Sequence, residues 1–223
     1  MNFTVKEECN ISDVADFLAS AILNQLKEGK KVLFFVTGGS SVVVGIEVVK
    51  ILENRVEENL LKNLVVTLTD ERYGEVNHKD SNWYQLVSRG FNLKGARLIH
   101  ILICSDSETT LKAFNKVLTD ELEKADYKIG LFGIGKDMHT AGILPNTVAA
   151  DSDDFACGYD TSQFSRITIT PKTILKLNEA VVYLKGQEKK DVVKNLEKEN
   201  DVKSEPAQML KKIPKLNIFA NYE

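Results

Sequence analysis

Hydrophobic residues along the first 145 positions follow two spacings. Short apolar runs are typical of buried strands, and apolar positions that repeat every three or four residues are typical of amphipathic helices. Because the two kinds of segment alternate, the pattern predicts a parallel sheet with right-handed helical crossovers. The predicted strands are Lys31–Thr37, Leu64–Thr69 and Tyr127–Phe132, and the helical stripes are Ile11, Val14, Leu18, Ile22, Leu26 and Leu111, Phe114, Leu118, Leu122.

Capping residues mark where the helices begin and end. Asn10 or Ser12 is expected to cap the first helix, and Gly29 to end it. Asp106 or Ser107 is expected to begin the long helix before the strand Tyr127–Phe132. These signals agree with the hydrophobic stripes, so both helices are predicted from two independent features.

The segment VVVGIEVVKILEN (42–54) is ambiguous, because β-branched residues fill its first half. It could be the second strand of a hairpin or a helix. As a helix it would follow a strand and the turn Gly38, Gly39, Ser40 and Ser41, whose backbone N–H groups and hydroxyls could bind a phosphate. The alternative is a plain turn without a ligand.

The C-terminal third continues the alternation. Arg166–Thr170 and Ala180–Leu184 are predicted strands, and Pro171 suits the first turn of a helix after the first of them. The charged segment 187–200 is predicted to be a helix with a narrow apolar stripe. Lys189 falls near its start, where the helix dipole disfavours a cation and a bound anion would remove the penalty; a solvated surface lysine is the alternative.

Composition limits the classes of function. The 223 residues are 43% hydrophobic and 27% charged, which is ordinary for one globular α/β domain over residues 1–223. The net charge of -3 favours neither nucleic acid nor an anionic membrane, and the apolar runs are too short to span one. Cys9, Cys104 and Cys157 are widely spaced, and the first residues do not resemble a secretion signal, so we expect a cytoplasmic protein.

Charged residues follow the strand Leu64–Thr69 directly. Asp70, Glu71 and Arg72 must face water, each other or a ligand. Arg72 could offer its planar guanidinium to a phosphate while the acids orient it, or it could simply pair with Asp70 or Glu71 in a solvated loop.

Polar residues also stand at the start of the next predicted helix. Ser81 is a predicted N-cap, and Asn82 either helps to cap the same helix or turns into a pocket. Two histidines are expected to have no role in a site: His78 is expected to be exposed, and His100 to be structural within a strand-like run. Neither is therefore a predicted site residue.

The loop Gly133–Pro145, GIGKDMHTAGILP, concentrates polar chemistry after a buried strand. Open α/β sheets bind ligands at the carboxyl ends of their strands. Asp137 and His139 lie two residues apart, so the carboxylate can orient the imidazole or share its proton. A lone histidine would more simply bond its own loop, but an Asp, a His and several glycines together favour a site.

These segments resemble motifs of the 6-phosphogluconolactonase family. GIGKDMHTAGILP is similar to its G-x-G-x-D-G-H-T-A-S-L-F-P signature, and VTGGSS to its S-G-G-S-T phosphate loop. DERY with DSN, RITIT and GQEK resemble further elements, in the family's order, across nearly the whole chain. With the alternation of strands and helices, the resemblance implies a three-layer α/β/α fold with a mainly parallel, Rossmann-like sheet.

Two positions depart from the family pattern. Met138 stands where the family has glycine, so a positive φ there would cost about 1–2 kcal/mol and could displace His139. Val42 replaces the usual proline after the Gly-Ser loop. The related glucosamine-6-phosphate isomerase/deaminases typically carry D-E-Y and G-H-I-A-F-N-E-P. Arg72 and the segment Leu144–Asn146 differ from those motifs, which favours the lactonase branch.

The resemblance implies hydrolysis of 6-phospho-D-glucono-1,5-lactone to 6-phospho-D-gluconate, in the oxidative pentose phosphate pathway. His139 is expected to be the general base on water, because imidazole titrates near neutral pH, with Asp137 holding or tuning it. Backbone N–H groups around Gly39 and Gly135 are candidates for the oxyanion site. The expected phosphate- and substrate-binding residues are Gly38, Gly39, Ser40, Ser41, Asp70, Arg72, Asn82, Gly135, Arg166 and Lys189.

The expected ligand is a small sugar phosphate, and no metal or cofactor is expected. The sequence does not set the oligomeric state, and a monomer is compatible with it. Two alternatives remain: a glucosamine-6-phosphate isomerase/deaminase-type enzyme that moves a proton with Asp70, and a non-catalytic sugar-phosphate sensor, favoured by Met138 alone.

Overall fold

The computed structural model describes residues 3–55 and 57–223, whose strands form two sheets. The larger sheet is parallel and has seven strands in the order β1-β10-β9-β6-β2-β3-β5; the smaller is antiparallel and has three, in the order β4-β8-β7. The strands are β1 (Phe3–Lys6), β2 (Val32–Val36), β3 (Leu64–Leu68), β4 (Asp70–Arg72), β5 (Arg97–Ile99), β6 (Tyr127–Phe132), β7 (Ala156–Asp160), β8 (Ser165–Ile169), β9 (Glu179–Lys185) and β10 (Lys215–Asn221).

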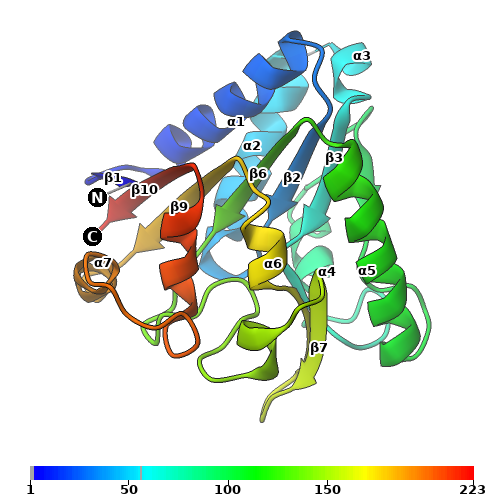
Figure 1. Ribbon diagram of the computed structural model, residues 1–223. Coiled ribbons are helices and arrows are strands. Elements are labelled where there is room, and N and C mark those ends of the chain that lie inside the picture. Colours follow the sequence, from blue (N-terminus) through cyan, green and yellow to red (C-terminus); the bar gives the residue numbers. More distant parts are fainter. Residues whose placement is uncertain (1–2, 56) are drawn as a thin grey trace.

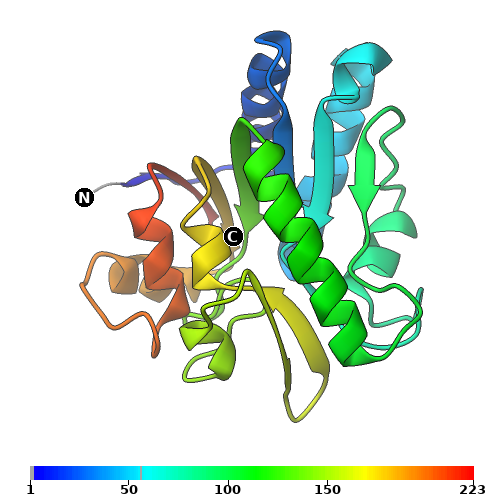
Figure 2. The same cartoon turned by 45° about the vertical axis from the view of Figure 1, so that its right-hand side comes forward.

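Helices cover both faces of the parallel sheet. Figures 1 and 2 show α1 and α2 on one side of it and α5 on the other, so the predicted three-layer α/β/α arrangement is confirmed. The helices are α1 (Ile11–Lys27), α2 (Val42–Arg55), α3 (Glu58–Leu61), α4 (Asn82–Val87), α5 (Ser107–Lys124), α6 (Pro171–Ile174) and α7 (Lys189–Leu196). Within the described residues, no helix combines the length and the apolar character needed to cross a membrane.

Local sequence explains the main elements. Every residue of β2 is buried, as expected for a central strand covered on both faces. Asn10 caps α1 and forms a capping box with Asp13, and Asp106 caps α5 through the backbone N–H of Thr109. Both helices therefore begin at one of the two residues that the sequence offered.

The ambiguous segment after β2 is helical. A 3₁₀ turn, Gly39–Ser41, leads directly into α2, which begins at Val42 without the family's proline. Valines 42, 44, 48 and 49 are buried, so packing against the sheet outweighs the weak helix propensity of β-branched residues. The strand–GGSS–helix arrangement is thus confirmed.

Between β2 and β6, which are parallel neighbours, the order in which the chain adds strands to the sheet reverses. After β2 the chain continues to β3 on one side, and after β6 it continues to β9 on the other. The crevice at such a switch point, outside the carboxyl ends of the strands, is where open α/β sheets bind ligands. The loops after β2 and β6 are the two predicted ligand loops.

Several strands were not foreseen from the sequence. The predicted strand Arg166–Thr170 is present as β8, but it belongs to the small antiparallel sheet, together with β4 and β7. The DER segment is itself a strand, β4, and not a loop. Strands β1 and β10 also extend the parallel sheet beyond the predicted elements.

Candidate active site

A cavity of about 250 Å³ opens at the switch point, bounded by the loops after β2 and β6, the start of α7 and the small sheet. All predicted site residues except Asp137 line it. They are Gly38, Gly39, Ser40, Ser41, Asp70, Arg72, Asn82, Gly135, His139, Arg166 and Lys189. Four further lining residues were not predicted, because they lie beside the predicted ones but carry no distinctive chemical group: Thr37, Gly133, Ile134 and Ala141.

His139 and Asp137 form a hydrogen-bonded pair. Nδ1 of His139 lies 2.6 Å from Oδ1 of Asp137, and 39% of the His139 side chain is exposed. Burial alone would raise the pKa of Asp137, but the hydrogen bond and charge of His139 outweigh it and lower the pKa of this carboxyl below its ordinary value. With Nδ1 engaged, Nε2 is the ring nitrogen that can accept a proton. The pair therefore supplies a water-accessible base.

Gly135 makes room for this pair. A Cβ at this position would lie 2.2 Å from Cε1 and Nδ1 of His139 and 2.6 Å from Oδ1 of Asp137, so a side chain there would displace both. The backbone N–H of Gly135 donates to the carbonyl of His139 at 2.9 Å. That N–H is occupied within its own loop, so the candidates for the oxyanion site are the other backbone N–H groups around Gly39 and Gly135.

The GGSS turn forms the opposite wall of the cavity. Gly39 adopts a φ of 65°, and the first turn of a helical segment leaves backbone N–H groups without intrahelical acceptors. A Cβ on Gly38 would lie 2.0 Å from Oδ1 of Asn82, so this glycine allows Asn82 to approach the turn. The Ser41 hydroxyl is buried and lies 3.5 Å from the carbonyl oxygen of Tyr183, whereas Ser40 is exposed.

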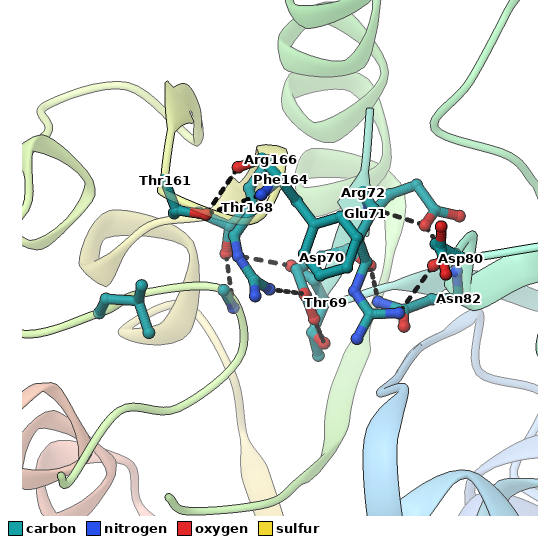
Figure 3. A network of polar contacts seen from close by, with 12 residues as sticks. Thr69, Asp70, Glu71, Arg72, Asp80, Asn82, Thr161, Phe164, Arg166 and Thr168 are labelled. Atoms are coloured by element: carbon teal, nitrogen blue, oxygen red, sulfur yellow. Dashed lines mark hydrogen bonds and ion pairs between the residues drawn. The ribbon is translucent and has the colours of Figure 1, made fainter. Parts of the chain in front are cut away.

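The three charged residues of β4 have separate environments (Figure 3). The Arg72 guanidinium donates to the carbonyl of Asp80 at 2.7 Å, and the carboxylate of Glu71 accepts the backbone N–H of Arg72 rather than its side chain. Asp70 instead faces Arg166, at 3.6 Å. The alternative in which the Arg72 side chain simply pairs with Asp70 or Glu71 in a solvated loop is therefore wrong.

The cavity is positively charged. Arg72, Arg166 and Lys189 line it, against the single lining carboxylate of Asp70. Nζ of Lys189 donates to the carbonyl of Ile134 at 2.7 Å, and burial is the main cause that lowers the pKa of this lysine below its ordinary value. Because removing a cation from water is unfavourable without a partner, such a cavity favours an anionic ligand.

Asn82 offers an acceptor beside these cations. Its Nδ2 donates to the carbonyl of Asp70 at 2.8 Å, and its Oδ1 is buried with no hydrogen-bond partner in the described part of the chain. An unpaired buried acceptor is unfavourable unless a ligand or water donates to it. Of the two roles considered for Asn82, the structure supports the one in the pocket, since Ser81 provides the side-chain cap of α4.

One family model matches residues 6–217, and its description is glucosamine-6-phosphate isomerases/6-phosphogluconolactonase. The chain belongs to this family. The matched region contains every residue of the cavity described above, so the family assignment covers the whole candidate site.

Relatives of both kinds in the family share the fold. A 6-phosphogluconolactonase of Borreliella burgdorferi is 27% identical over 168 residues, which cover 69% of this chain and 70% of that protein. The structure of 6-phosphogluconolactonase from Thermotoga maritima matches with a TM-score of 0.84 at 18% identity, covering 98% of both chains. A monomeric glucosamine-6-phosphate deaminase matches with a TM-score of 0.79 at 19% identity, covering 98% of this chain and 97% of that one. The family fold alone therefore does not distinguish the two reactions.

The other two histidines of this family member lie outside the cavity lining. His78 is half-buried, not exposed as expected, and its Nε2 lies 3.0 Å from the carbonyl oxygen of Arg72. His100 follows the end of β5, is exposed, and its ring centroid lies 4.1 Å from that of Trp83. Although the residue is exposed, partial desolvation of its imidazole lowers the pKa of His100.

Over residues 3–55 and 57–223, no group of three or more His, Cys, Asp and Glu side chains is placed to hold a metal ion.

Proposed function

We propose that this protein is a 6-phosphogluconolactonase that hydrolyses 6-phospho-D-glucono-1,5-lactone to 6-phospho-D-gluconate, in the oxidative pentose phosphate pathway. The observation that carries the proposal is one cavity that combines a carboxylate-held imidazole, His139, with three cations and the start of a helical segment. The lactonases among the relatives add support. The substrate has a phosphate at one end and a reactive ester at the other, which matches this division of the cavity.

In the proposed reaction His139 activates water. Nε2 takes a proton from a water molecule as its oxygen attacks the lactone carbonyl carbon, C1, and Asp137 stabilises the imidazolium that forms. The C1–ring oxygen bond then breaks, and the imidazolium returns the proton to the departing ring oxygen. The products are a hydroxyl group and a carboxylic acid on one open chain, and the acid loses its proton to solvent to become the carboxylate of 6-phospho-D-gluconate. A general base of this kind typically contributes about 10²–10⁴-fold in rate.

The cations would fix the other end of the substrate. The phosphate is proposed to lie against Gly39, Ser40, Arg72 and Lys189, with Arg166 beside it, and Oδ1 of Asn82 would accept a sugar hydroxyl. Holding both ends places C1 next to the base, which replaces a chance encounter by a fixed geometry. The phosphate is thus expected to contribute to rate as well as to binding.

Replacing His139 by Ala tests the proposal. We expect kcat to fall by at least ~10²-fold on freshly generated 6-phosphogluconolactone, because the water loses its base. The rate is measured in an assay coupled to oxidation of 6-phosphogluconate, after spontaneous lactone hydrolysis is subtracted. His100→Ala makes the same change outside the cavity and should keep wild-type kcat. An unchanged kcat in His139→Ala would rule out this residue as the base.

The same preparations distinguish the alternatives. A deaminase-type enzyme has support from the shared fold of the solved deaminase and from Asp70 in the cavity, and it would release ammonia from glucosamine 6-phosphate. A sensor would bind 6-phosphogluconate saturably without hydrolysing the lactone. Lactone hydrolysis without ammonia release is the outcome that the proposal requires.

A further inference from the structure

Arg72 and Arg166 face each other across two antiparallel strands. They are directly paired in the register of β4 and β8, so their side chains project from the same face of the small sheet. Like charges in this position repel. Asp70 gives Arg166 one carboxylate, at 3.6 Å, and Arg72 has the neutral carbonyl of Asp80. One carboxylate does not neutralise two guanidiniums, so the arginine pair carries a net positive charge. The repulsion between the two arginines tends to drive their side chains apart.

The ring of Phe164 lies against both guanidiniums (Figure 3). Its centroid is 5.4 Å from Cζ of Arg72 and 5.7 Å from Cζ of Arg166. Nε of each arginine is buried and has no hydrogen-bond acceptor among residues 3–55 and 57–223. A cation within about 6 Å of a ring centroid is attracted by the π-system, and arginine also stacks its plane on aromatic faces. The ring thus partly replaces the water lost around two half-buried cations.

The backbone of Phe164 is fixed by its own hairpin. The residue ends the turn between β7 and β8, where the Thr161 hydroxyl accepts its N–H at 3.0 Å and donates to its carbonyl at 2.8 Å. The Thr161 N–H also donates to the Phe164 carbonyl at 2.9 Å. The ring is therefore held from outside the cavity, and it is not among the residues that line it.

We propose that Phe164 is a positioning residue for phosphate recognition: it holds Arg72 and Arg166 side by side so that both face one phosphate. The inference rests on the proposed function for the identity of the ligand. Without the ring, each guanidinium would gain rotamer freedom and move away from the other, and binding would have to order both again. Phe164 therefore acts through the arginines and not on the substrate.

Phe164→Leu removes the π-face and keeps an apolar side chain of related size. Two cation–π contacts at partly exposed sites correspond to about a 5- to 30-fold change in an equilibrium constant. We expect the Kd for 6-phosphogluconate, measured by calorimetric titration, and the KM for the phosphorylated lactone to rise by that factor. The kcat for the phosphorylated lactone and the activity on unphosphorylated gluconolactone should stay at their wild-type values.

Three further variants separate positioning from folding. Phe164→Tyr keeps the aromatic face and should restore wild-type Kd, whereas Thr161→Val removes the hydroxyl that holds the turn and should weaken binding by less than Phe164→Leu. Phe155→Leu is the matched control, because this ring carries the Lys172 ammonium at 4.7 Å outside the cavity; it should leave Kd unchanged.

Each outcome decides the inference. A wild-type Kd in Phe164→Leu, an equal loss in Phe164→Tyr, or equal losses on both lactones would overturn it. If the wild-type protein binds 6-phosphogluconate without hydrolysing the lactone, the proposed function fails and the Kd series still tests Phe164. If the wild-type protein does not bind 6-phosphogluconate, both fail.

Discussion

Met138 occupies the position between the two residues of the proposed base. Its φ is 64°, so this position does need the left-handed conformation that glycine supplies in the family pattern. Its side chain is only 2% exposed and joins the hydrophobic core. Its N–H donates to the carbonyl of Gly135 and its carbonyl accepts from Ala207, and the 2.6 Å contact between His139 and Asp137 is intact. The methionine therefore does not displace the histidine.

Met138→Gly has two opposing effects on the free energy of unfolding. Glycine relieves about 1–2 kcal/mol of backbone strain, but removing a buried methionine side chain costs about 2–5 kcal/mol. We expect the free energy of unfolding to fall by about 1–3 kcal/mol, measured by urea denaturation, with kcat on the lactone nearly unchanged. Met138→Leu keeps both the strain and the volume, and should lose less than about 1.5 kcal/mol. A Met138→Gly protein more stable than wild type would show that strain outweighs burial.

Some residue contacts follow from sequence, and others do not. The pairing of Asp137 with His139 is local, so their spacing sufficed to predict that the side chains could meet. The contact between Asp70 and Arg166 joins strands 96 positions apart, and the sequence suggested Arg72 as the partner instead. Phe164 had no signal at all, because a lone aromatic residue before a strand shows nothing about what will lie on its ring.

Glu71 joins two elements, β4 and α4. The residue is only 1% exposed. Oε1 accepts the N–H groups of Arg72, at 2.7 Å, and Asn82, at 2.6 Å, while Oε2 accepts the Ser81 hydroxyl at 2.8 Å and the Trp83 N–H at 3.0 Å. Burial raises the pKa of Glu71 above its ordinary value although these hydrogen bonds work against it. The glutamate thus fixes the positions of two cavity residues, Arg72 and Asn82.

Glu71→Gln has two opposing effects on stability: it removes the buried charge, and it replaces a hydrogen-bond acceptor by a donor. A raised pKa means that ionised Glu71 is less favourable in the folded than in the unfolded chain, so removing the charge alone would stabilise the protein. However, the amide NH₂ of glutamine would face either two N–H groups or the Ser81 hydroxyl, which can rotate to accept, and the Trp83 N–H, which cannot. At least one buried donor is then left without an acceptor, at a cost of about 1–3 kcal/mol. We expect the free energy of unfolding at neutral pH to fall by about 1–3 kcal/mol in urea denaturation, and 6-phosphogluconate binding to weaken.

A second buried carboxylate provides the control for this prediction. Glu179 accepts one donor on each oxygen, from Asn217 and from the Tyr127 hydroxyl. Because a hydroxyl can rotate to accept from an amide, Glu179→Gln should lose less stability than Glu71→Gln and should not affect ligand binding. Equal losses in the two variants would contradict the role given to the four donors around Glu71.

At the scale of elements, the spacing of hydrophobic residues along the chain predicted the strands of the parallel sheet better than those of the antiparallel sheet. Strands such as β2 are fully buried apolar runs, and they need no partner to be recognised. By contrast, β4 has three charged residues and pairs with a strand far along the chain, β8. Local propensity cannot show such pairing. The sequence therefore contains no sign that DER forms a strand and leaves a solvated loop open as an alternative, although its place at the end of β3 was predicted correctly.

The two sheets meet at the cavity. The parallel sheet contributes the GGSS turn, the His139 loop and Lys189, and the small sheet contributes Asp70, Arg72 and Arg166. A ligand that bridges both should stabilise the whole molecule, because only the folded chain holds these groups together. Stability measured with ligand therefore reports how the site is assembled.

Stabilisation by 6-phosphogluconate is expected to depend on pH through Lys189. At about 100 times its Kd the ligand adds about 2.7 kcal/mol, or roughly 5–11 °C in Tm. The lowered pKa of Lys189 means that its charge opposes folding below that pKa, and this penalty disappears as pH rises through it. The neutral amine then attracts phosphate less. The Tm shift should therefore shrink between neutral pH and the ordinary lysine value of 10.5.

Lys189→Arg should keep the full Tm shift over this range, because arginine stays protonated. Lys194→Arg changes an exposed lysine on the same helix, α7, and should behave as the wild type. The measurement is thermal unfolding with and without 6-phosphogluconate at each pH. A Tm shift that shrinks equally in the wild type and in Lys189→Arg would show that Lys189 does not bind the phosphate. In that case Arg72 and Arg166, on the small sheet, would be left as the cations that hold it.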